Sequence, residues 1–167
     1  MQNFNETYDV LVVGSGCGGL TAALTANISN SLKVLIIEKS KLIGGTSATS
    51  GGVIWIPNNH HALKVGADDS ISEAKQYLKS TIPPDEFNEP MIDAYLEHGP
   101  KMVKFMEDNT DVSYTSLEHY PDYFQDAPGV KLGNRALEPS PVSADTLGED
   151  VDNLHPIRNN IRLSFSL

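Results

Sequence analysis

A glycine-rich turn between an apolar strand and a helix constrains this chain more than any other feature. Residues 8–14, YDVLVVG, are β-branched and apolar, which predicts a parallel strand buried on both faces. Residues 18–28, GGLTAALTANI, predict a helix that lies on a sheet, and residues 32–38, LKVLIIE, predict a second buried strand. Strand, helix and strand follow one another within about 30 residues, the size of one βαβ crossover, which is right-handed almost without exception.

The turn itself has the pattern G-x-G-x-x-G. In such a turn the first glycine allows the tight bend, the second leaves room for a pyrophosphate, and the third lets helix and strand pack closely. The helix N-terminus then offers unpaired N–H groups and the positive end of its dipole to phosphates. The motif predicts a Rossmann-like dinucleotide site; the alternative is that the glycines only make a tight turn. The predicted cofactor contacts are Gly14, Ser15, Gly16, Cys17, Gly18 and Gly19.

An acidic residue ends the second predicted strand. Glu38 follows Gly19 by 19 residues, and a carboxylate at this distance accepts hydrogen bonds from a ribose 2′-hydroxyl and repels a 2′-phosphate, which disfavours NADP. The alternative is a solvated acid at a strand end. We include the neighbouring Lys39 among the predicted cofactor contacts. A thiol at a helix N-terminus can be reactive, but for Cys17 we favour a small residue tolerated in a crowded loop.

Residues 44–52, GGTSATSGG, distinguish FAD from NAD. The chain starts no standard crossover helix after Glu38, and a long cofactor with a flavin ring needs a second backbone segment beside it. Glycines allow that approach, and hydroxyls supply donors and acceptors. A flexible linker is the alternative, but residues 53–57, VIWIP, are apolar again and favour a tethered turn. The predicted FAD contacts here are Gly44, Gly45, Thr46, Ser47, Ser50, Gly51 and Gly52.

The rest of the chain predicts helices and then an irregular segment. Residues 70–82 predict a helix that begins with a capping box. Residues 88–98 predict another, and Gly99-Pro100 predicts a stop followed by a restart. Residues 112–117 predict a short strand. From residue 119 prolines and glycines predict a long segment without regular structure, which is usually functional or disordered.

We therefore predict an α/β chain: a Rossmann-like FAD-binding βαβ unit with an incomplete parallel sheet, followed by helices and a long irregular segment. Residues 1–57 form the N-terminal part of the FAD-binding domain in this prediction. Residues 58–118 form a helical continuation of it, and residues 119–167 lead toward a substrate domain.

Charge and cysteine content exclude several kinds of partner. The chain has 22 Asp and Glu against 12 Lys and Arg, a formal net charge of −10, which argues against nucleic acid or an anionic membrane. No apolar run approaches the roughly 20 residues of a membrane span, and residues 1–9 lack a signal peptide's features. Cys17 is the single cysteine, so no internal disulfide can form. This favours a reducing compartment, and we expect a cytoplasmic protein.

Two segments carry a resemblance to a known family. YDVLVVGSGCGGLTAA and VLIIEKSKLIGGTSATSGGVIWIPNN resemble the start of the flavoproteins grouped with fumarate reductase flavoprotein subunits. Within that group they are most similar to the 3-ketosteroid Δ1-dehydrogenases, from about residue 8 to about residue 125. The resemblance implies FAD as the cofactor, lined by residues 44–47.

The resemblance also gives a role to one tyrosine. In Tyr120-Pro121-Asp122-Tyr123, Tyr123 matches a tyrosine of that family which supports a second, proton-abstracting tyrosine. By itself the segment predicts only a loop with two exposed or half-buried tyrosines. The resemblance implies a dehydrogenase that abstracts the proton α to the carbonyl of a steroid-like ketone and transfers hydride to flavin N5.

Three further expectations concern completeness and alternatives. The family's chains run to several hundred residues, so we expect a truncated N-terminal fragment. One alternative is a non-catalytic FAD-binding fragment. Another is a fumarate reductase-like flavoprotein, which needs cations for substrate carboxylates; the candidates are Arg135, Arg158 and Arg162.

For Trp55 and for the His60-His61 pair we predict a structural role rather than a functional one. We expect Trp55 to be an ordinary core residue rather than a flavin neighbour. His60 and His61 have no third ligand at metal-site spacing. We therefore expect two polar loop residues and no metal.

Overall fold

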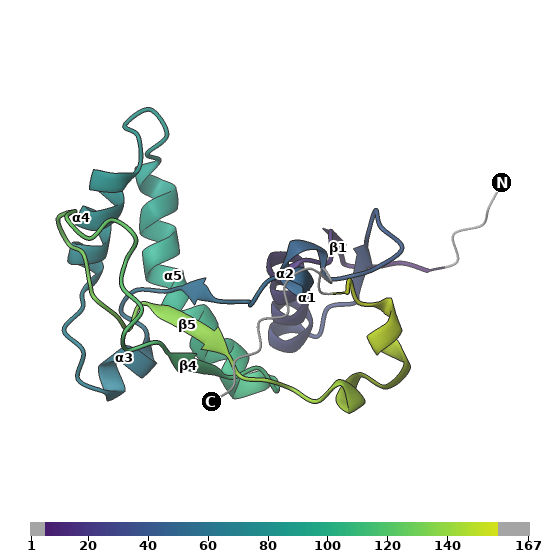
Figure 1. Ribbon diagram of the computed structural model, residues 1–167. Coiled ribbons are helices and arrows are strands. Elements are labelled where there is room, and N and C mark those ends of the chain that lie inside the picture. Colours follow the sequence, from purple (N-terminus) through teal and green to yellow (C-terminus); the bar gives the residue numbers. More distant parts are fainter. Residues whose placement is uncertain (1–5, 157–167) are drawn as a thin grey trace. The chain divides into compact units, whose positions relative to one another are not determined.

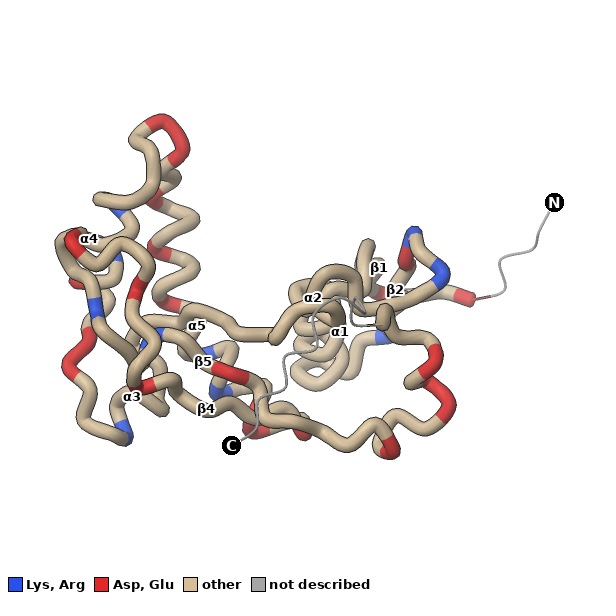
Figure 2. The backbone as a smooth tube through the Cα atoms, viewed as in Figure 1, with Lys and Arg blue, Asp and Glu red and all other residues tan. Residues whose placement is uncertain are grey.

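The computed structural model describes residues 6–156, which divide into two units (Figure 1). One unit comprises Met1–Gly52 together with Pro141–Leu167, and the other comprises Val53–Ser140. Acidic residues are spread along the tube of each unit rather than gathered in one segment (Figure 2). Among the described residues, no helix is long and apolar enough to cross a membrane.

The first unit contains the predicted βαβ arrangement. Strand β1 (Val10–Val13) leads into helix α1 (Cys17–Asn30), and α1 leads into strand β2 (Val34–Ile37). The strands are parallel and in register from Val10↔Val34 to Val13↔Ile37, and α1 packs on both. The α/β fold with a small, incomplete parallel sheet is thus confirmed.

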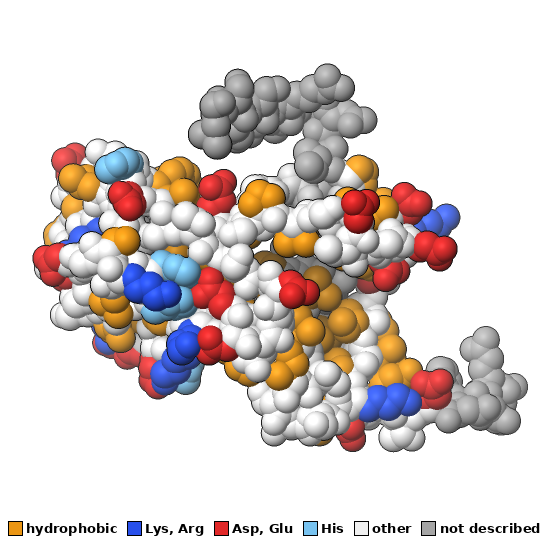
Figure 3. Space-filling model, turned by 90° about the horizontal axis from the view of Figure 1, so that it is seen from below, with side chains coloured by type: hydrophobic (Ala, Val, Ile, Leu, Met, Phe, Trp, Pro, Cys, Tyr) orange, Lys and Arg blue, Asp and Glu red, His pale blue; other side chains and the backbone are white. Residues whose placement is uncertain are grey.

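The two strands are not buried on both faces, which corrects that prediction. Leu11 is 58% exposed, Val13 76% and Ile37 44%, because within the described residues α1 covers this two-stranded sheet from one side. Hydrophobic side chains accordingly reach the molecular surface (Figure 3). A parallel sheet normally has both faces covered, so this unit presents an apolar surface that its own described residues leave open.

The C-terminal part of the first unit closes against the segment after β2. The backbone N–H of Ile43 donates to the carbonyl of Asn153 at 2.8 Å, and the N–H of His155 donates to the carbonyl of Ile43 at 2.9 Å. Helix α2 (Gly45–Thr49) makes the predicted glycine-rich turn partly helical. The 3₁₀ helix η1 (Ala144–Asn153) begins at the capping side chain of Ser143.

The second unit contains an antiparallel sheet in the order β3-β5-β4. Its strands are β3 (Ile54–Trp55), β5 (Ala136–Pro139) and β4 (Tyr114–Ser116). The prediction of a long irregular segment from residue 119 is therefore wrong at β5 and η1. Strand β5 forms because it pairs with strands about 20 and 80 residues earlier in the chain, and local composition does not reveal such pairing.

Three helices complete the second unit: α3 (His60–Lys64), α4 (Ile71–Thr81) and α5 (Glu89–Asn109). The predicted N-cap is confirmed, since the Ser70 hydroxyl accepts from the N–H of Glu73 at 3.2 Å. The second half of the capping box is absent, because the Glu73 carboxylate accepts from that hydroxyl at 2.9 Å while the backbone N–H of Ser70 donates to Asp69. The histidine pair begins α3 rather than lying in a loop. The buried Asn59 side chain starts that helix by accepting from the N–H of Ala62 at 2.9 Å.

Helix α5 runs through Gly99 and Pro100 without a break, so the predicted stop and restart are wrong. Leu96, Gly99, Val103 and Met106 are its buried residues, and their spacing of three and four places them on one face. A Cβ on Gly99 would lie 3.4 Å from the Ile56 side chain, so glycine allows this face to pack closely. That packing offsets the hydrogen bond that Pro100 cannot donate to the preceding turn.

Candidate functional site

The glycine turn in the first unit needs glycine at two positions for its own geometry. Gly14 has φ of +100°, a conformation that side-chain-bearing residues avoid. A Cβ on Gly19 would lie 2.2 Å from the Gly14 carbonyl oxygen, so only glycine lets α1 approach β1. Gly16 differs, because a Cβ there would meet no atom nearer than the Ser47 hydroxyl at 3.7 Å. The space beside Gly16 is open to a ligand.

The N-cap residue of α1 offers no side chain to the amides that open the helix. Its N-cap is Gly16, which makes no side-chain hydrogen bond, and the first turn holds no acidic residue. Of the first amides, that of Cys17 donates to the Ser47 hydroxyl at 3.0 Å. Helix α1 has 14 residues, and the first-turn N–H groups of such a helix together with its dipole favour an anionic group.

Glu38, which directly follows β2, holds the glycine turn in place through hydrogen bonds to Ser15. Its Oε2 accepts from the Ser15 backbone N–H at 3.0 Å and from the Ser15 hydroxyl at 2.6 Å. The same hydroxyl accepts from the N–H of Gly44 at 3.0 Å. Ser15 is 2% exposed, so this buried hydroxyl connects three segments. The sequence suggested a cofactor contact at Ser15 but not this connecting role.

The hydrogen bonds keep Glu38 ionised. The bond from the Ser15 hydroxyl, followed by those from the N–H groups of Ser40 and Ser15, lowers the pKa of Glu38 from 4.5 to about 2. A carboxylate offers about four acceptor positions, and three are used by these donors. One position therefore remains for a ribose hydroxyl.

The start of α1, the segment around α2 and the C-terminal part of the unit line one cavity in the first unit. It has a volume of about 750 Å³ and is lined by Ser15, Cys17, Gly44 and Ser47, with Val151 and Leu154 among the residues on the other side. This volume lies within the range of small-molecule and cofactor sites. Dinucleotide contacts predicted from separate stretches of sequence thus meet in one place.

The other predicted contacts, Gly16 and Glu38 included, lie outside the lining of this cavity. Thr46 and Lys39 are exposed, and the exposed Ser50 uses its hydroxyl locally, donating to the Ser47 carbonyl at 3.1 Å and accepting from the N–H of Gly52 at 3.1 Å. Ser50 and Gly52 therefore shape the turn after α2. Their contact with a cofactor stays a prediction, as does that of Gly51.

In the second unit a buried arginine organises the loop that holds the predicted catalytic tyrosine. Arg135 is 1% exposed. Its Nη1 donates to Asp122 at 2.7 Å, and its Nη2 and Nε donate to Asp69 at 2.7 and 3.1 Å. Two carboxylates therefore neutralise this guanidinium, and it is not available to hold a substrate carboxylate. Arg158 and Arg162, the other candidates for that role, lie outside the described residues.

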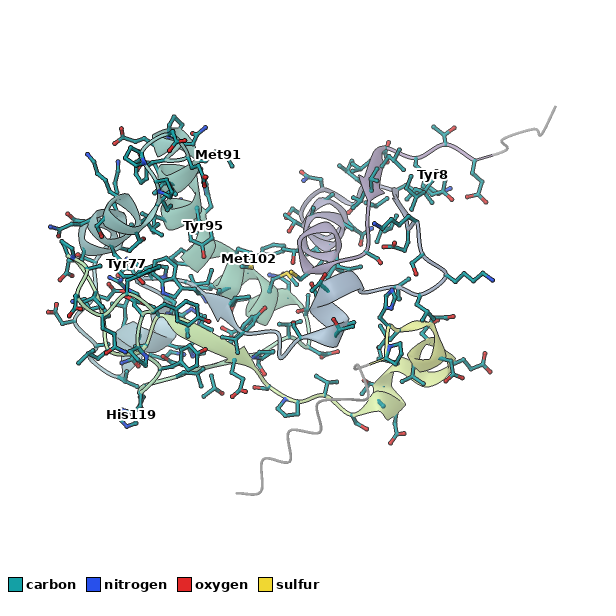
Figure 4. All side chains as sticks on the ribbon, turned by 45° about the horizontal axis from the view of Figure 1, so that its top comes forward. Tyr8, Tyr77, Met91, Tyr95, Met102 and His119 are labelled. Atoms are coloured by element: carbon teal, nitrogen blue, oxygen red, sulfur yellow. The ribbon has the colours of Figure 1, made fainter. Side chains whose placement is uncertain are left out.

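Asp122 ties the same loop to the sheet. Its Oδ1 accepts from the Trp55 indole N–H at 2.6 Å, and its Oδ2 accepts from the N–H of Lys131 at 2.9 Å. The Trp55 ring lies 5.9 Å from that of Tyr77 and is stacked 6.5 Å from that of Tyr95; Figure 4 shows these two tyrosines on α4 and α5. Trp55 is thus half-buried in a polar network, and the sequence carried no signal for the Asp122–Arg135 pairing.

The predicted catalytic residue lies at the surface of this loop. Tyr123 is 81% exposed, and its hydroxyl lies 3.5 Å from that of Tyr120. The hydrogen bond with Tyr123 raises the pKa of Tyr120. Both rings border a cavity of about 320 Å³, which Trp55, Tyr77 and Phe124 also line. The loop therefore presents phenols beside an aromatic cavity.

The first unit thus combines a strand, a glycine turn and a helix with an acidic residue after the second strand and a cavity at the turn. These features define a dinucleotide-binding protein of the Rossmann type. Residues 9–154 match the family model described as FAD binding domain. Since this match spans most of the 167 residues, the chain belongs to the FAD binding domain family. The prediction of FAD as the cofactor is confirmed.

Relatives with known activities agree with the predicted resemblance. The chain is 40% identical to a 4-oxocyclohexanecarboxylate 2-dehydrogenase of Sinomonas cyclohexanicum over 163 residues, which are 97% of this chain and 28% of that protein. It is 39% identical to a 3-oxosteroid 1-dehydrogenase of Mycobacterium tuberculosis over 160 residues, 95% of this chain and 28% of that protein. The chain thus spans little more than a quarter of these relatives.

A solved structure of a ketosteroid dehydrogenase is also similar to this chain. The crystal structure of 3-ketosteroid delta1-dehydrogenase from Sterolibacterium denitrificans in complex with 1,4-androstadiene-3,17-dione matches with a TM-score of 0.83 and 42% identity. The match covers 90% of this chain and 26% of that one. The predicted likeness to ketosteroid dehydrogenases is therefore confirmed.

Proposed function

We propose that this chain holds FAD in a dehydrogenase of the CH–CH class that acts on a 3-ketosteroid-like alicyclic ketone. The observation that carries the proposal is the cavity of about 750 Å³ at the N-terminus of α1, whose first turn holds no acidic residue. The relatives' names support the substrate class, since both describe dehydrogenation of a ring ketone. The proposal includes the predicted domain boundaries at residues 57 and 118 and a cytoplasmic location.

In this proposal the first unit binds the cofactor in two places. The pyrophosphate lies at the amides that open α1, beside Gly16, and Glu38 accepts hydrogen bonds from a ribose hydroxyl. Ser47 orients its hydroxyl at the same turn, where it already accepts from Cys17. The remaining predicted contacts line the rest of the cofactor: Gly14, Ser15, Gly18, Gly19, Lys39, Gly44, Gly45, Thr46, Ser50, Gly51 and Gly52.

The second unit contributes the tyrosine loop. FAD, when bound, supplies the hydride acceptor. The ketone carbonyl makes the neighbouring C–H acidic, because it takes the developing negative charge onto its oxygen, where hydrogen-bond donors can stabilise it. Tyr123 is the catalytic residue that we propose in this chain: its phenol passes a proton or polarises a partner group, and Tyr120 lies within reach of it. The Asp122–Arg135 pair holds the loop in place.

Cofactor binding is tested on the purified 167-residue chain. We expect a yellow protein with the visible absorption of bound flavin, and Gly16→Val should abolish it while Tyr8→Phe, in the same unit, leaves it unchanged. A folded chain that takes up no FAD would contradict the proposed site.

The reaction is tested on the reading frame extended to the length of the relatives. We expect reduction of an artificial dye that depends on a 3-ketosteroid, and a Tyr123→Phe variant that binds FAD normally but loses about 100-fold or more of the rate. An extended protein that binds FAD and reduces no dye overturns the steroid assignment. It would leave the non-catalytic FAD-binding alternative in place.

A further inference from the structure

Two histidines and a glutamate of the second unit meet in one small cluster. His60 and His61 begin α3, and Glu107 lies near the end of α5. The His60 Nε2 lies 2.8 Å from Glu107 Oε2, and the His61 Nε2 lies 2.9 Å from Glu107 Oε1. Potential ligand atoms of all three residues lie within 4.8 Å of one another. Glu107 is 46 positions from His61, which is why sequence spacing did not show a third ligand.

The side chains are held before any ion binds. Their exposed fractions are 26%, 20% and 16% for His60, His61 and Glu107, and the two imidazole centroids lie 4.2 Å apart. The backbone N–H of Tyr114 donates to Glu107 Oε1 at 2.9 Å, which fixes the carboxylate. Such preorganisation lowers the conformational entropy that a ligand must remove on binding.

Hydrogen bonding within the protein leaves this cluster incompletely satisfied. Both Nε2 atoms face one carboxylate, and the buried His60 Nδ1 has no hydrogen-bond partner among the described residues. Burial and the neighbouring His61 lower the pKa of His60, which favours the neutral imidazole that binds metals. Burial raises the pKa of Glu107, but the N–H of Tyr114 and the His61 ring outweigh it and keep that pKa below the ordinary value.

We propose that His60, His61 and Glu107 form a binding site for a divalent transition-metal ion of the zinc type, completed by water. Two imidazole nitrogens and one carboxylate oxygen are the donor set of open zinc sites, whereas calcium and magnesium prefer oxygen alone. Ligands of a tetrahedral zinc ion lie about 3.3 Å apart, so the Nε2–carboxylate separations must widen by only about half an ångström. The chain's net charge of −10 also favours a cation.

The site shares no residue with the proposed cofactor contacts or with the tyrosine loop. A bound ion connects α3 to α5 and, through the Tyr114 N–H on Glu107, to the start of β4. Its effect is therefore structural: the ion stabilises the second unit. The proposal can fail while the proposed FAD function stands, and the reverse is also true.

The test is a titration of the purified, metal-stripped protein with Co²⁺, which reports ligation through its visible absorption. We expect one equivalent to bind and Zn²⁺ to displace it. Glu107→Gln keeps an acceptor for Tyr114 but removes the charge, and His61→Asn removes a ligand. Loss of outer-shell partners already costs about 10–100-fold in affinity, so we expect each variant to weaken binding at least about 100-fold.

The matched controls are His98→Ala and His119→Ala, which change histidines that are exposed and outside the cluster. Figure 4 shows His119 at the periphery of its unit, and Figure 3 shows histidines among charged side chains on one face. Both controls should bind Co²⁺ as the wild type does. Zn²⁺ should raise the melting temperature of the wild type and of His119→Ala, but not of Glu107→Gln.

Two results would overturn the proposal. One is a wild-type protein that melts cooperatively and shows no saturable Co²⁺ absorption. The other is a Glu107→Gln variant that binds Co²⁺ with wild-type affinity, which would place the ion elsewhere. Binding should also weaken as the pH falls, because the ligands then take up protons.

Discussion

Individual residues in this chain carry more than one task. Ser15 connects Glu38 to Gly44 through a buried hydroxyl, and Arg135 connects Asp69 to Asp122. Each is buried, polar and fully engaged, so replacing it leaves partners without hydrogen bonds. A buried polar group that loses its partner costs about 1–3 kcal/mol, and more if it is charged.

Removing the charge of Arg135 should destabilise the second unit strongly. Arg135→Met leaves two buried carboxylates unpaired, and breaking a buried ion pair in this way costs about 3–5 kcal/mol. Urea unfolding measures the loss. The control is Lys104→Met, since Lys104 pairs with Asp108 while 64% exposed, and an exposed pair contributes at most about 1 kcal/mol. Equal effects of the two substitutions would contradict the role of Arg135.

Glu38 should contribute stability that depends on pH. Its pKa is lowered to about 2 in the folded chain, so the contribution is fully present above the ordinary value near 4.5 and is lost as the pH falls toward 2. Glu38→Gln should flatten the fall in melting temperature over that range. Thermal melts at successive pH values measure it, with Glu149→Gln, an exposed acid in the same unit, as the control. A parallel fall in wild type and Glu38→Gln would show that this carboxylate is not the group responsible.

At the scale of elements, packing decides which glycines can change. Helix α1 approaches β1 because Gly19 has no side chain, whereas a Cβ on Gly18 would meet nothing within 4 Å. Helix α5 approaches Ile56 through Gly99 in the same way. A side chain at Gly19 should therefore disturb the packing of α1, whereas a side chain at the adjacent Gly18 should not.

Gly19→Ala should displace α1 and weaken FAD binding, because its Cβ would lie 2.2 Å from the Gly14 carbonyl oxygen. Gly18→Ala, the matched control for packing, should keep the wild-type melting temperature, because its Cβ meets nothing within 4 Å. Flavin retention during gel filtration and the melting temperature measure both variants. A Gly19→Ala protein with wild-type flavin content would refute the packing argument.

Gly99→Leu should destabilise the second unit by about 1–3 kcal/mol, the usual cost of overpacking a core. Met91→Leu, on the exposed part of α5, should change stability by much less. Denaturant unfolding compares the two, and a neutral Gly99→Leu would mean that α5 can move away from Ile56 at no cost.

At the scale of the whole molecule, the two units have different tasks. The first holds the proposed cofactor cavity, and the second holds the Arg135 network, the tyrosine loop and the proposed metal site. FAD should therefore protect backbone amides of residues 14–52 from hydrogen exchange, while the amides of α5 keep their rates. Hydrogen–deuterium exchange with and without FAD measures this, and protection confined to residues 89–109 would place the cofactor site in the wrong unit.

The βαβ unit, its glycine turn, FAD as the cofactor and the N-cap at Ser70 could all be predicted from the sequence. These features depend on neighbours within a few residues or on a strand–helix–strand repeat, and their physical causes act locally. The resemblance from about residue 8 to about residue 125 extended the prediction to the family.

Features that depend on partners far along the chain became visible only in the folded structure. Local signals at Gly99 and Pro100 favoured a helix end, but packing against Ile56 continued α5. Strand β5 formed in a segment rich in proline and glycine because β3 and β4 pair with it. Glu107 lies beside His60 and His61 although 46 or more positions separate them in the sequence. Arg135 can be buried because Asp69 and Asp122 neutralise its charge. Packing and charge pairing between residues far apart in the sequence leave no pattern in local spacing, so these four features depend on the three-dimensional fold.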